Sequence, residues 1–257
     1  MKQKSLISIN ISTGTYNSFI TELISMSAQK SSYTCIANVH MLVEAHKDAS
    51  FSAVVNNADI VTPDGIPLTW GLKLLHGIKQ DRVAGMDILP DLLKAAEEKA
   101  IPVYFYGGTD EMLDKTKEFI NLHFNKLKLA GIYSPPFRIL SEEENNDIIQ
   151  SINKSGAKLV FVVLGCPKQE KWMSSMRGRI NAAMIGVGGA LPVFIGMKKR
   201  APRWMQKSGM EWLFRWAQEP RRLFKRYLVT NSLFLFLLSK EWIASGFKKK
   251  RPDISSY

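Results

Sequence analysis

Apolar and polar positions alternate along the first three quarters of the chain with two different periods. Short apolar runs, of which the nearly continuous Val, Leu and Phe run at 158–164 is the clearest, are typical of buried strands. Segments with apolar residues at every third or fourth position lie between them and are typical of amphipathic helices. The pattern predicts strands at 6–9, 33–37, 59–62, 102–106, 127–132, 158–164 and 182–187. It predicts helices at 16–26, 40–46, 86–100 and 111–123, one that begins at 141, and one at 167–179.

Strands that alternate with helices predict an α/β fold, with a Rossmann-like, mostly parallel sheet. Helix-start signals support this order: Thr109 or Asp110 as a cap, Ser141 followed by three glutamates, and Pro167 in a first turn. Beyond Gly196 the strand signals stop, and two helices are expected at 208–217 and 221–243. We therefore expect a catalytic domain over 1–196 and a helical appendage over 197–257.

Charge supports the same boundary. Residues 1–196 hold 20 Lys and Arg against 19 Asp and Glu, whereas residues 197–257 hold 15 against 4 and also four of the six tryptophans. A basic, aromatic-rich segment favours a helix lying at an anionic membrane surface, with nucleic-acid binding or a solvated basic face as alternatives. No apolar stretch reaches the roughly 18 residues of a membrane-spanning helix, and two cysteines exclude a disulfide framework.

Four expected strand ends carry glycine or Pro-Asp-Gly, at 63–65, 107–108, 165–167 and 188–189. In an open α/β sheet ligands bind at the carboxyl ends of the strands, where glycines and helix N-termini admit a phosphate. Four such loops together favour an anionic ligand, in the first place a nucleotide, although each loop alone could be only a tight turn. None has the spacing of a dinucleotide-binding or P-loop motif.

Asp64 is the most informative carboxylate, because Pro63 and Gly65 could hold it rigidly at a strand end as a general base. Asp-Gly is also a common turn pair, so a purely structural role stays open. His40 and Glu44 could share a helix face, but no third metal ligand follows, and no Asp-x-Asp motif is present. Cys166 begins a helix without a histidine partner, which favours a structural role.

Several motifs, in order and at matching spacing over about residues 34–230, resemble those of the WecG/TagA/CpsF glycosyltransferases. The most specific are Pro-Asp-Gly and the Gly-x-Pro-Lys-Gln-Glu run. The matching stretches are Ala37-Asn38-Val39-His40-Met41, Val61-Thr62-Pro63-Asp64-Gly65, Arg82-Val83-Ala84-Gly85, Tyr106-Gly107-Gly108, Leu164-Gly165-Cys166-Pro167-Lys168-Gln169-Glu170, Arg200-Ala201-Pro202-Arg203-Trp204 and Gln218-Glu219-Pro220-Arg221-Arg222.

The resemblance implies an inverting transferase that needs neither metal nor cofactor. It would move a sugar, N-acetylmannosamine or another hexose, from a UDP-sugar to a polyprenyl-diphosphate-linked sugar for cell-surface polysaccharide, as a peripheral protein at the cytoplasmic membrane face. It assigns Asp64 as the base and Arg215 and Arg222 as supports of the leaving diphosphate. Ile36 stands where some members carry a threonine, so the donor sugar could differ. The substrate-binding residues expected are Asn38, Arg82, Gly107, Gly108, Gly165, Gln169, Gly188 and Gly189.

The alternative function is a nucleotide-binding Rossmann oxidoreductase, which would need a nicotinamide-binding signature that the sequence lacks. We expect an anionic membrane surface rather than nucleic acid as a partner. The oligomeric state stays open, a homo-oligomer included.

Overall fold

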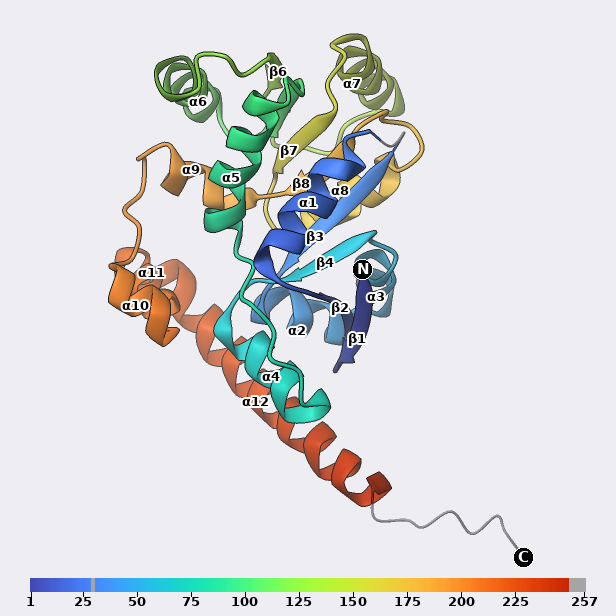
Figure 1. Ribbon diagram of the computed structural model, residues 1–257, viewed down its shortest axis with the longest axis vertical. Helices are drawn as coiled ribbons and strands as arrows, with labels where there is room; N and C mark the ends of the chain where they lie inside the picture. The colour runs from blue at the N-terminus through green and yellow to red at the C-terminus, as the bar shows by residue number, and fades with distance from the viewer. Residues whose placement is uncertain (29–30, 250–257) are drawn as a thin grey trace, which may run out of the picture.

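The computed structural model describes residues 1–28 and 31–249, and a six-stranded sheet lies at its centre (Figure 1). All its paired strands run parallel, in the order β4-β3-β8-β7-β5-β6. This confirms the predicted Rossmann-like α/β fold. The strands are β3 (Ser32–Ala37), β4 (Ile60–Pro63), β5 (Val103–Gly107), β6 (Leu129–Tyr133), β7 (Leu159–Val163) and β8 (Ala183–Gly186).

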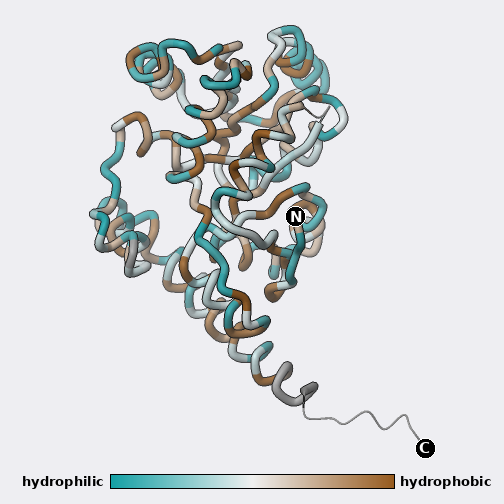
Figure 2. Tube along the Cα trace, viewed as in Figure 1, coloured by the Kyte–Doolittle hydropathy of each residue, from teal (hydrophilic) through white to brown (hydrophobic). Residues whose placement is uncertain are grey.

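Helices cover both faces of the sheet, so neighbouring strand residues enter two different cores. Val160 and Val162 of β7 pack on one side, whereas Phe161 packs on the other and stacks on Phe105. Burial on both faces explains the continuous apolar runs, which appear as the hydrophobic centre of Figure 2. The first face carries α2 (Val39–Lys47), α3 (Ala49–Asn56), α7 (Glu142–Lys154) and α8 (Lys168–Met176). The second carries α1 (Tyr16–Met26), α5 (Gly85–Glu98), α6 (Asp110–His123) and α9 (Leu191–Phe194).

The N-terminal strand prediction is wrong in its placement. Residues 6–9 form the turn of an antiparallel hairpin outside the main sheet, made by β1 (Lys2–Leu6) and β2 (Ile9–Thr13). Ile7 has a φ of 59°, a left-handed conformation that a strand does not contain. Leu6 and Ile9 pair across this turn and are both buried. In the sequence, these two neighbouring strand ends therefore have the pattern of one short apolar strand.

The predicted helix starts are mostly confirmed. The Thr109 side chain caps α6, and Ser141 and Glu144 form the reciprocal capping box of α7. Pro167 precedes α8 as its cap residue rather than lying inside its first turn. The sequence patterns did not identify α3, the 3₁₀ turn η1 (Gly188–Ala190), α4 (Ile66–His76) and α10 (Arg203–Ser208).

Three helices make up the described part of the C-terminal segment: α10, α11 (Glu211–Gln218) and α12 (Pro220–Lys249). Helix α12 runs past α2 and α4 (Figure 1). Its Phe234 and Leu238 are buried in the same core as Leu6 and Leu72. Residues 250–257 of the expected appendage lie outside the described residues. Within the described part, no helix is both long enough and apolar enough to cross a membrane.

Candidate active site

The expected site residues gather along one edge of the sheet because all six strands end there. Asp64 follows β4, Asn38 follows the adjacent β3, and η1 with Gly188 and Gly189 follows β8, the next strand. Gly165 follows β7, and the pair at 107–108 ends β5. The parallel order thus brings together loops that are far apart in sequence, as expected for a ligand site of an open α/β sheet.

Asp64 is held at this edge by its backbone. Its N–H donates to the Ala37 carbonyl at 2.7 Å. The next residue, Gly65, has a φ of 125°, which side-chain-bearing residues rarely adopt, and α4 begins directly after it. Burial raises the pKa of the Asp64 carboxyl to about 6; the charges of Arg82 and Arg215 oppose this rise, and those of Glu211 and Asp87 add to it. Asp64 is therefore largely ionised at neutral pH yet basic enough to accept a proton.

Arg82 is the cation that lowers the pKa of Asp64 most. Its segment is fixed to β4, because Val83 N donates to the Pro63 carbonyl at 3.0 Å and the Thr62 hydroxyl donates to the Val83 carbonyl at 3.1 Å. The guanidinium donates to Asp87 and to Glu211 of α11, each at 2.7 Å. Arg82 thus connects the sheet domain to the C-terminal helices beside Asp64.

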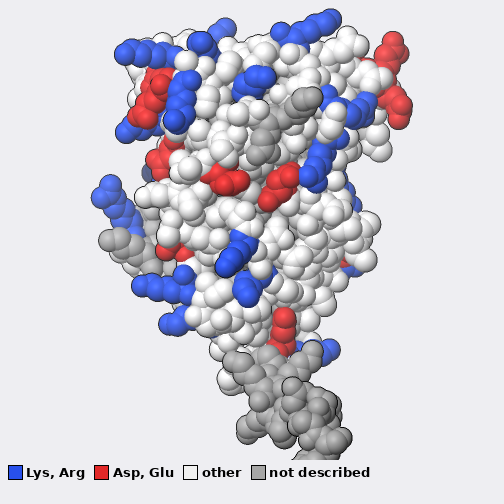
Figure 3. Space-filling model, turned by 45° about the vertical axis from the view of Figure 1, so that its right-hand side comes forward, with Lys and Arg blue, Asp and Glu red and all other residues white. Residues whose placement is uncertain are grey.

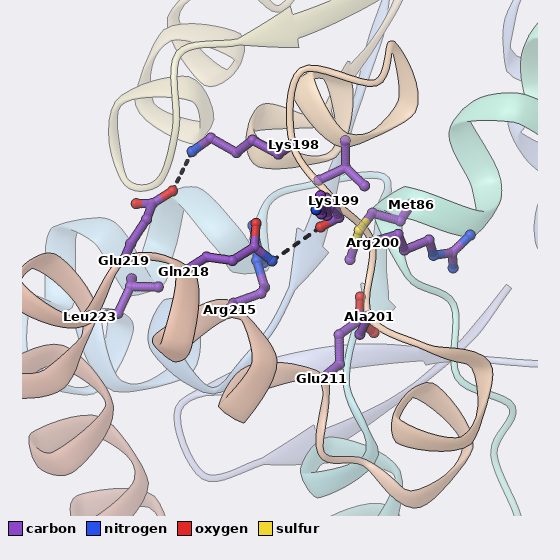
Figure 4. Close-up of a pocket in the computed structure, with 11 residues that line it drawn as sticks. Met86, Lys198, Lys199, Arg200, Ala201, Glu211, Arg215, Gln218, Glu219 and Leu223 are labelled. Carbon is purple, nitrogen blue, oxygen red and sulfur yellow. Dashed lines mark hydrogen bonds and ion pairs between the residues drawn. The ribbon is translucent and has the colours of Figure 1, made fainter.

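Arg215 reaches the same edge from α11. Its guanidinium lies against Gly189, where a β-carbon would come within 2.8 Å of Nη2. Figure 4 shows Arg215 and Glu211 extending from α11 beside segment 198–201, where Lys198 pairs with Glu219. The cavity between these parts has a volume of about 20 Å³, which is room for roughly one water molecule. Helix α11 therefore packs closely against the sheet edge.

Arg222 lies in a different environment from Arg215. Its side chain, in the first turn of α12, is 64% exposed and pairs with Glu219, the residue just before this helix. Arg226, one turn further along α12, is half-buried, and its Nε has no hydrogen-bond partner within the described residues. Burial, together with the charges of Arg215 and Arg222, lowers the pKa of Arg226. The catalytic role expected of Arg222 stays a prediction.

Asn38 and Gln169 both use part of their amide groups within the protein. Asn38 caps α2 by accepting from Met41 N at 3.1 Å. Gln169 is buried, accepts from Gly165 N at 3.2 Å and donates to Glu170 at 2.7 Å. These bonds orient both side chains at the sheet edge, and Gln169 also fixes the loop after β7. Their expected contacts with substrate stay predictions.

The glycine loops differ in what their backbone requires. Gly107 has a φ of 103°, and a β-carbon there would lie 2.7 Å from the Val163 carbonyl oxygen. The packing of β5 on β7 is therefore by itself a sufficient reason for a glycine at this position. Gly188 leaves room for the Gln169 amide, which a β-carbon would approach to 2.9 Å. Gly165, with a φ of 77°, faces open space. Gly108, with a φ of 85°, and Gly165 thus each have a backbone reason to be glycine, as Gly107 has. The substrate-binding roles expected of these glycines stay predictions.

His40, Glu44 and Cys166 show no sign of metal or nucleophile chemistry. His40 Nδ1 lies 3.9 Å from Glu44 Oε1, and burial lowers the pKa of His40 to about 4. Within residues 1–28 and 31–249, no three His, Cys, Asp or Glu side chains are grouped as metal ligands. Burial and the nearby Glu170 raise the pKa of the Cys166 thiol, so it stays protonated.

Three charged residues next to the candidate site were not predicted from the sequence: Glu211, Asp87 and Arg226. Glu211 is buried, and its Oε1 has no hydrogen-bond partner in the part of the chain described. The spacing of Glu211 and Arg215, four residues apart on one helix, was the available signal, since such positions share a helix face. Asp87 had no comparable signal, because Arg82 lies outside α5 and shares no helix face with it, and Arg200 is 113 positions away.

The fold and this site define an α/β protein with a carboxyl of raised pKa at the sheet edge, near two arginines and two acidic residues. Such a site suits acid–base chemistry on an anionic substrate. The sequence matches the glycosyl transferase WecG/TagA/CpsF family over residues 4–248, and the chain belongs to this family.

Two relatives are named N-acetylglucosaminyldiphosphoundecaprenol N-acetyl-beta-D-mannosaminyltransferase. The protein from Bacillus spizizenii (strain ATCC 23059 / NRRL B-14472 / W23) is 30% identical over 225 residues, covering 86% of each chain. The one from Bacillus subtilis (strain 168) is 31% identical over 205 residues, covering 79% of this chain and 78% of the relative. The family assignment confirms the resemblance seen in the motifs and favours glycosyl transfer over an oxidoreductase.

Proposed function

We propose that this protein is an inverting, metal-independent glycosyltransferase that moves N-acetylmannosamine, or another hexose, from a UDP-sugar to N-acetylglucosaminyl-diphosphoundecaprenol. The names of the two relatives supply the acceptor and the transferred sugar. The observation that carries the proposal is Asp64, a carboxylate at the sheet edge with a pKa of about 6 that responds to the charges of Arg82 and Arg215. This is the arrangement expected of a general base beside an anionic leaving group.

In the proposed reaction, Asp64 removes the proton from a hydroxyl group of the acceptor sugar. The hydroxyl oxygen forms a bond to the anomeric carbon of the donor from the face opposite the UDP. The bond between that carbon and the phosphate oxygen breaks, and UDP leaves with its electron pair. Arg215 and Arg82 stabilise the negative charge that develops on the diphosphate, which preorganised guanidinium groups do effectively. Arg222 joins them if the first turn of α12 closes over the donor.

We propose further that the protein is peripheral, at the cytoplasmic face of the membrane. Residues 197–257 carry 15 Lys and Arg against 4 Asp and Glu. Each basic residue near an anionic surface contributes about 1 kcal/mol. Exposed apolar side chains on α12 and α4 also support a position at the membrane surface: Leu235, Phe236, Trp242, Ile243, Trp70 and Leu74. By contrast, both charge signs are scattered over the visible face of the sheet domain (Figure 3).

The test is a screen of UDP-sugars for UDP release, with an N-acetylglucosaminyl-diphosphate acceptor on a short lipid. UDP-N-acetylmannosamine should give the fastest acceptor-dependent release, and EDTA should leave the rate unchanged. The product should carry a glycosidic bond of inverted configuration. UDP release that ignores the acceptor, or activity that EDTA abolishes and Mg²⁺ restores, would contradict the respective part of the proposal.

A further inference from the structure

Two carboxylates hold the guanidinium of Arg82, and they come from different parts of the molecule. Asp87 belongs to α5, where the next two residues, Ile88 and Leu89, are fully buried in the core of the sheet domain. Glu211 is the first residue of α11, which packs mainly on its neighbours α10 and α12. Each bond is 2.7 Å long. Asp87 is therefore a fixed partner of Arg82, whereas the position of Glu211 depends on how the C-terminal helices are placed.

The Glu211 carboxylate is only partly satisfied where it lies. It is buried, and one of its oxygens accepts a hydrogen bond from Arg82. The other oxygen, Oε1, has no hydrogen-bond partner within residues 1–28 and 31–249. A buried carboxylate oxygen without a partner costs free energy, so native proteins keep few of them. A contact that is exchanged during function explains this one, because such a contact need not be optimal in any single arrangement.

The space beside this ion pair is too small for a diphosphate. Arg215 extends from α11 beside Glu211, four residues further along the helix (Figure 4). The cavity that both side chains line has a volume of about 20 Å³, which is room for roughly one water molecule. A diphosphate bound between α11 and the sheet edge therefore requires α11 to shift, and Glu211 shifts with it.

Charge favours an exchange of Glu211 for such a ligand. A diphosphate offers a guanidinium the same kind of oxygen acceptors as a carboxylate, with more negative charge. It would also repel a carboxylate bound to the same guanidinium. Glu219, the residue after α11, has a similar position, since it pairs with Lys198 and with Arg222. The C-terminal helices thus bring carboxylates to cations that the proposed function assigns to the diphosphate.

We propose that Glu211 competes with the diphosphate of the donor for Arg82 and is exchanged for it when the donor binds. The inference rests on the proposed function for the identity of the donor. The ion pair between Arg82 and Glu211 keeps α11 against the sheet edge until an anion that binds Arg82 more strongly takes its place. Asp87 holds Arg82 at the sheet edge throughout. Glu211 thereby sets how strongly an anion must bind in order to reach Arg82.

Calorimetric titration of the full chain with UDP and with inorganic diphosphate tests this exchange. Glu211→Gln removes the competing charge and keeps the shape of the side chain, so both ligands should bind about tenfold more tightly than to wild type. Tenfold is about 1.4 kcal/mol. Glu118→Gln, at an exposed position of α6, changes the net charge equally and should leave both affinities within about twofold. Arg82→Gln removes the contested guanidinium, so adding Glu211→Gln to it should give less than about a twofold further gain.

A Glu211 that only orients Arg82 predicts the opposite sign, because its loss would weaken binding. Unchanged or weaker binding of both ligands in Glu211→Gln would therefore overturn the proposal, and so would a full gain in the Arg82→Gln background. Glu211→Ala, a second variant without the charge, should show a gain as well, which guards against a folding defect of one variant. Failure of the proposed function gives a different result. Inorganic diphosphate would still bind more tightly to Glu211→Gln, while UDP would bind no better than inorganic diphosphate and no UDP-sugar would support acceptor-dependent UDP release.

Discussion

Asp64 combines a rigid backbone position, partial burial and charged neighbours of both signs. As a general base it should contribute a rate factor of roughly 100 to 10,000. Asp64→Asn keeps the shape of the side chain but cannot accept the proton. We therefore expect kcat to fall by that factor, while UDP affinity in calorimetry stays within about threefold. Asp114→Asn, an exposed position on α6, is the matched control and should keep full activity. A variant at position 64 that retains a third of the wild-type rate would exclude the assignment.

The pKa of Asp64 makes a separate prediction about pH. Because the base must be ionised, kcat/KM should fall as pH drops through about 6, the pKa of this carboxyl. Arg82→Gln removes the charge that lowers this pKa most, so its acidic limb should move to higher pH. Glu211→Gln removes a charge that raises it, so its limb should move to lower pH. Each shift should be on the order of one pH unit, equivalent to about 1.4 kcal/mol.

Rate profiles from pH 4.5 to 9 for the three proteins would measure these shifts. Opposite displacements are hard to obtain from general damage to the site, which would lower the rate at every pH. Two limbs that move in the same direction, or a wild-type limb that is absent, would show that Asp64 is not the titrating base.

The sequence was informative about Asp64 and uninformative about its neighbours, for a physical reason. Pro63 and Gly65 restrict the local backbone, so a rigid turn at a strand end could be predicted from three adjacent residues. Glu211 bonds to Arg82 across 129 positions, and only the packing of α11 on the sheet edge brings them together. The pKa of Asp64 depends on such contacts, so it could not be predicted from local sequence.

Secondary-structure elements, too, were predictable where their cause is local and were missed where it depends on distant contacts. Strands with two buried faces were predicted because the whole run must be apolar, and α6 and α7 were predicted because capping is local. Helix α4 was missed: its environment is set by β1 and α12, which pack on it from both ends of the chain. The misplaced strand at 6–9 has a related cause, since a tight turn between two apolar residues has no polar gap to mark it.

Helix α12 should contribute to folding as well as to function. Phe234 is 2% exposed and packs in a core with β1 and α4, whereas Phe236 is 64% exposed on the same helix. Phe234→Ala should lower the free energy of unfolding by about 3–5 kcal/mol, the usual cost of removing a buried phenylalanine. Phe236→Ala should change it by no more than about 0.5 kcal/mol. Urea denaturation of both variants measures this, and equal stabilities would show that α12 is not part of the core.

This packing changes what a truncation can show about the whole molecule. A chain ending near Gly196 would lose Phe234 and Leu238 from the core and uncover apolar surface on α2 and α4. Loss of activity in that chain could then reflect loss of stability. Separating membrane binding from catalysis therefore needs point substitutions in the full-length protein.

Arg215→Ala combined with Arg222→Ala separates these two roles. The C-terminal segment keeps 13 of its 15 basic residues, so at about 1 kcal/mol per basic residue near the surface the attraction to anionic vesicles should be reduced only in part. If both arginines support the leaving diphosphate as proposed, the diphosphate loses two guanidinium groups. We expect most sedimentation with vesicles to persist and acceptor-dependent UDP release to fall by on the order of 100-fold or more, comparable to the loss of one preorganised electrostatic donor.

The complementary variant, Lys240→Glu, reverses a charge at an exposed position of α12 that is remote from the candidate site. It should weaken vesicle binding, since it removes one positive charge and adds a negative one, while turnover of a water-soluble acceptor stays at the wild-type level. The two variants therefore predict opposite losses in two assays on the same full-length chain. The double arginine variant could instead turn over the soluble acceptor at the wild-type rate. In that case these arginines serve membrane attraction alone. Charge stabilisation at the diphosphate must then come from Arg82 and the helix N-termini at the sheet edge.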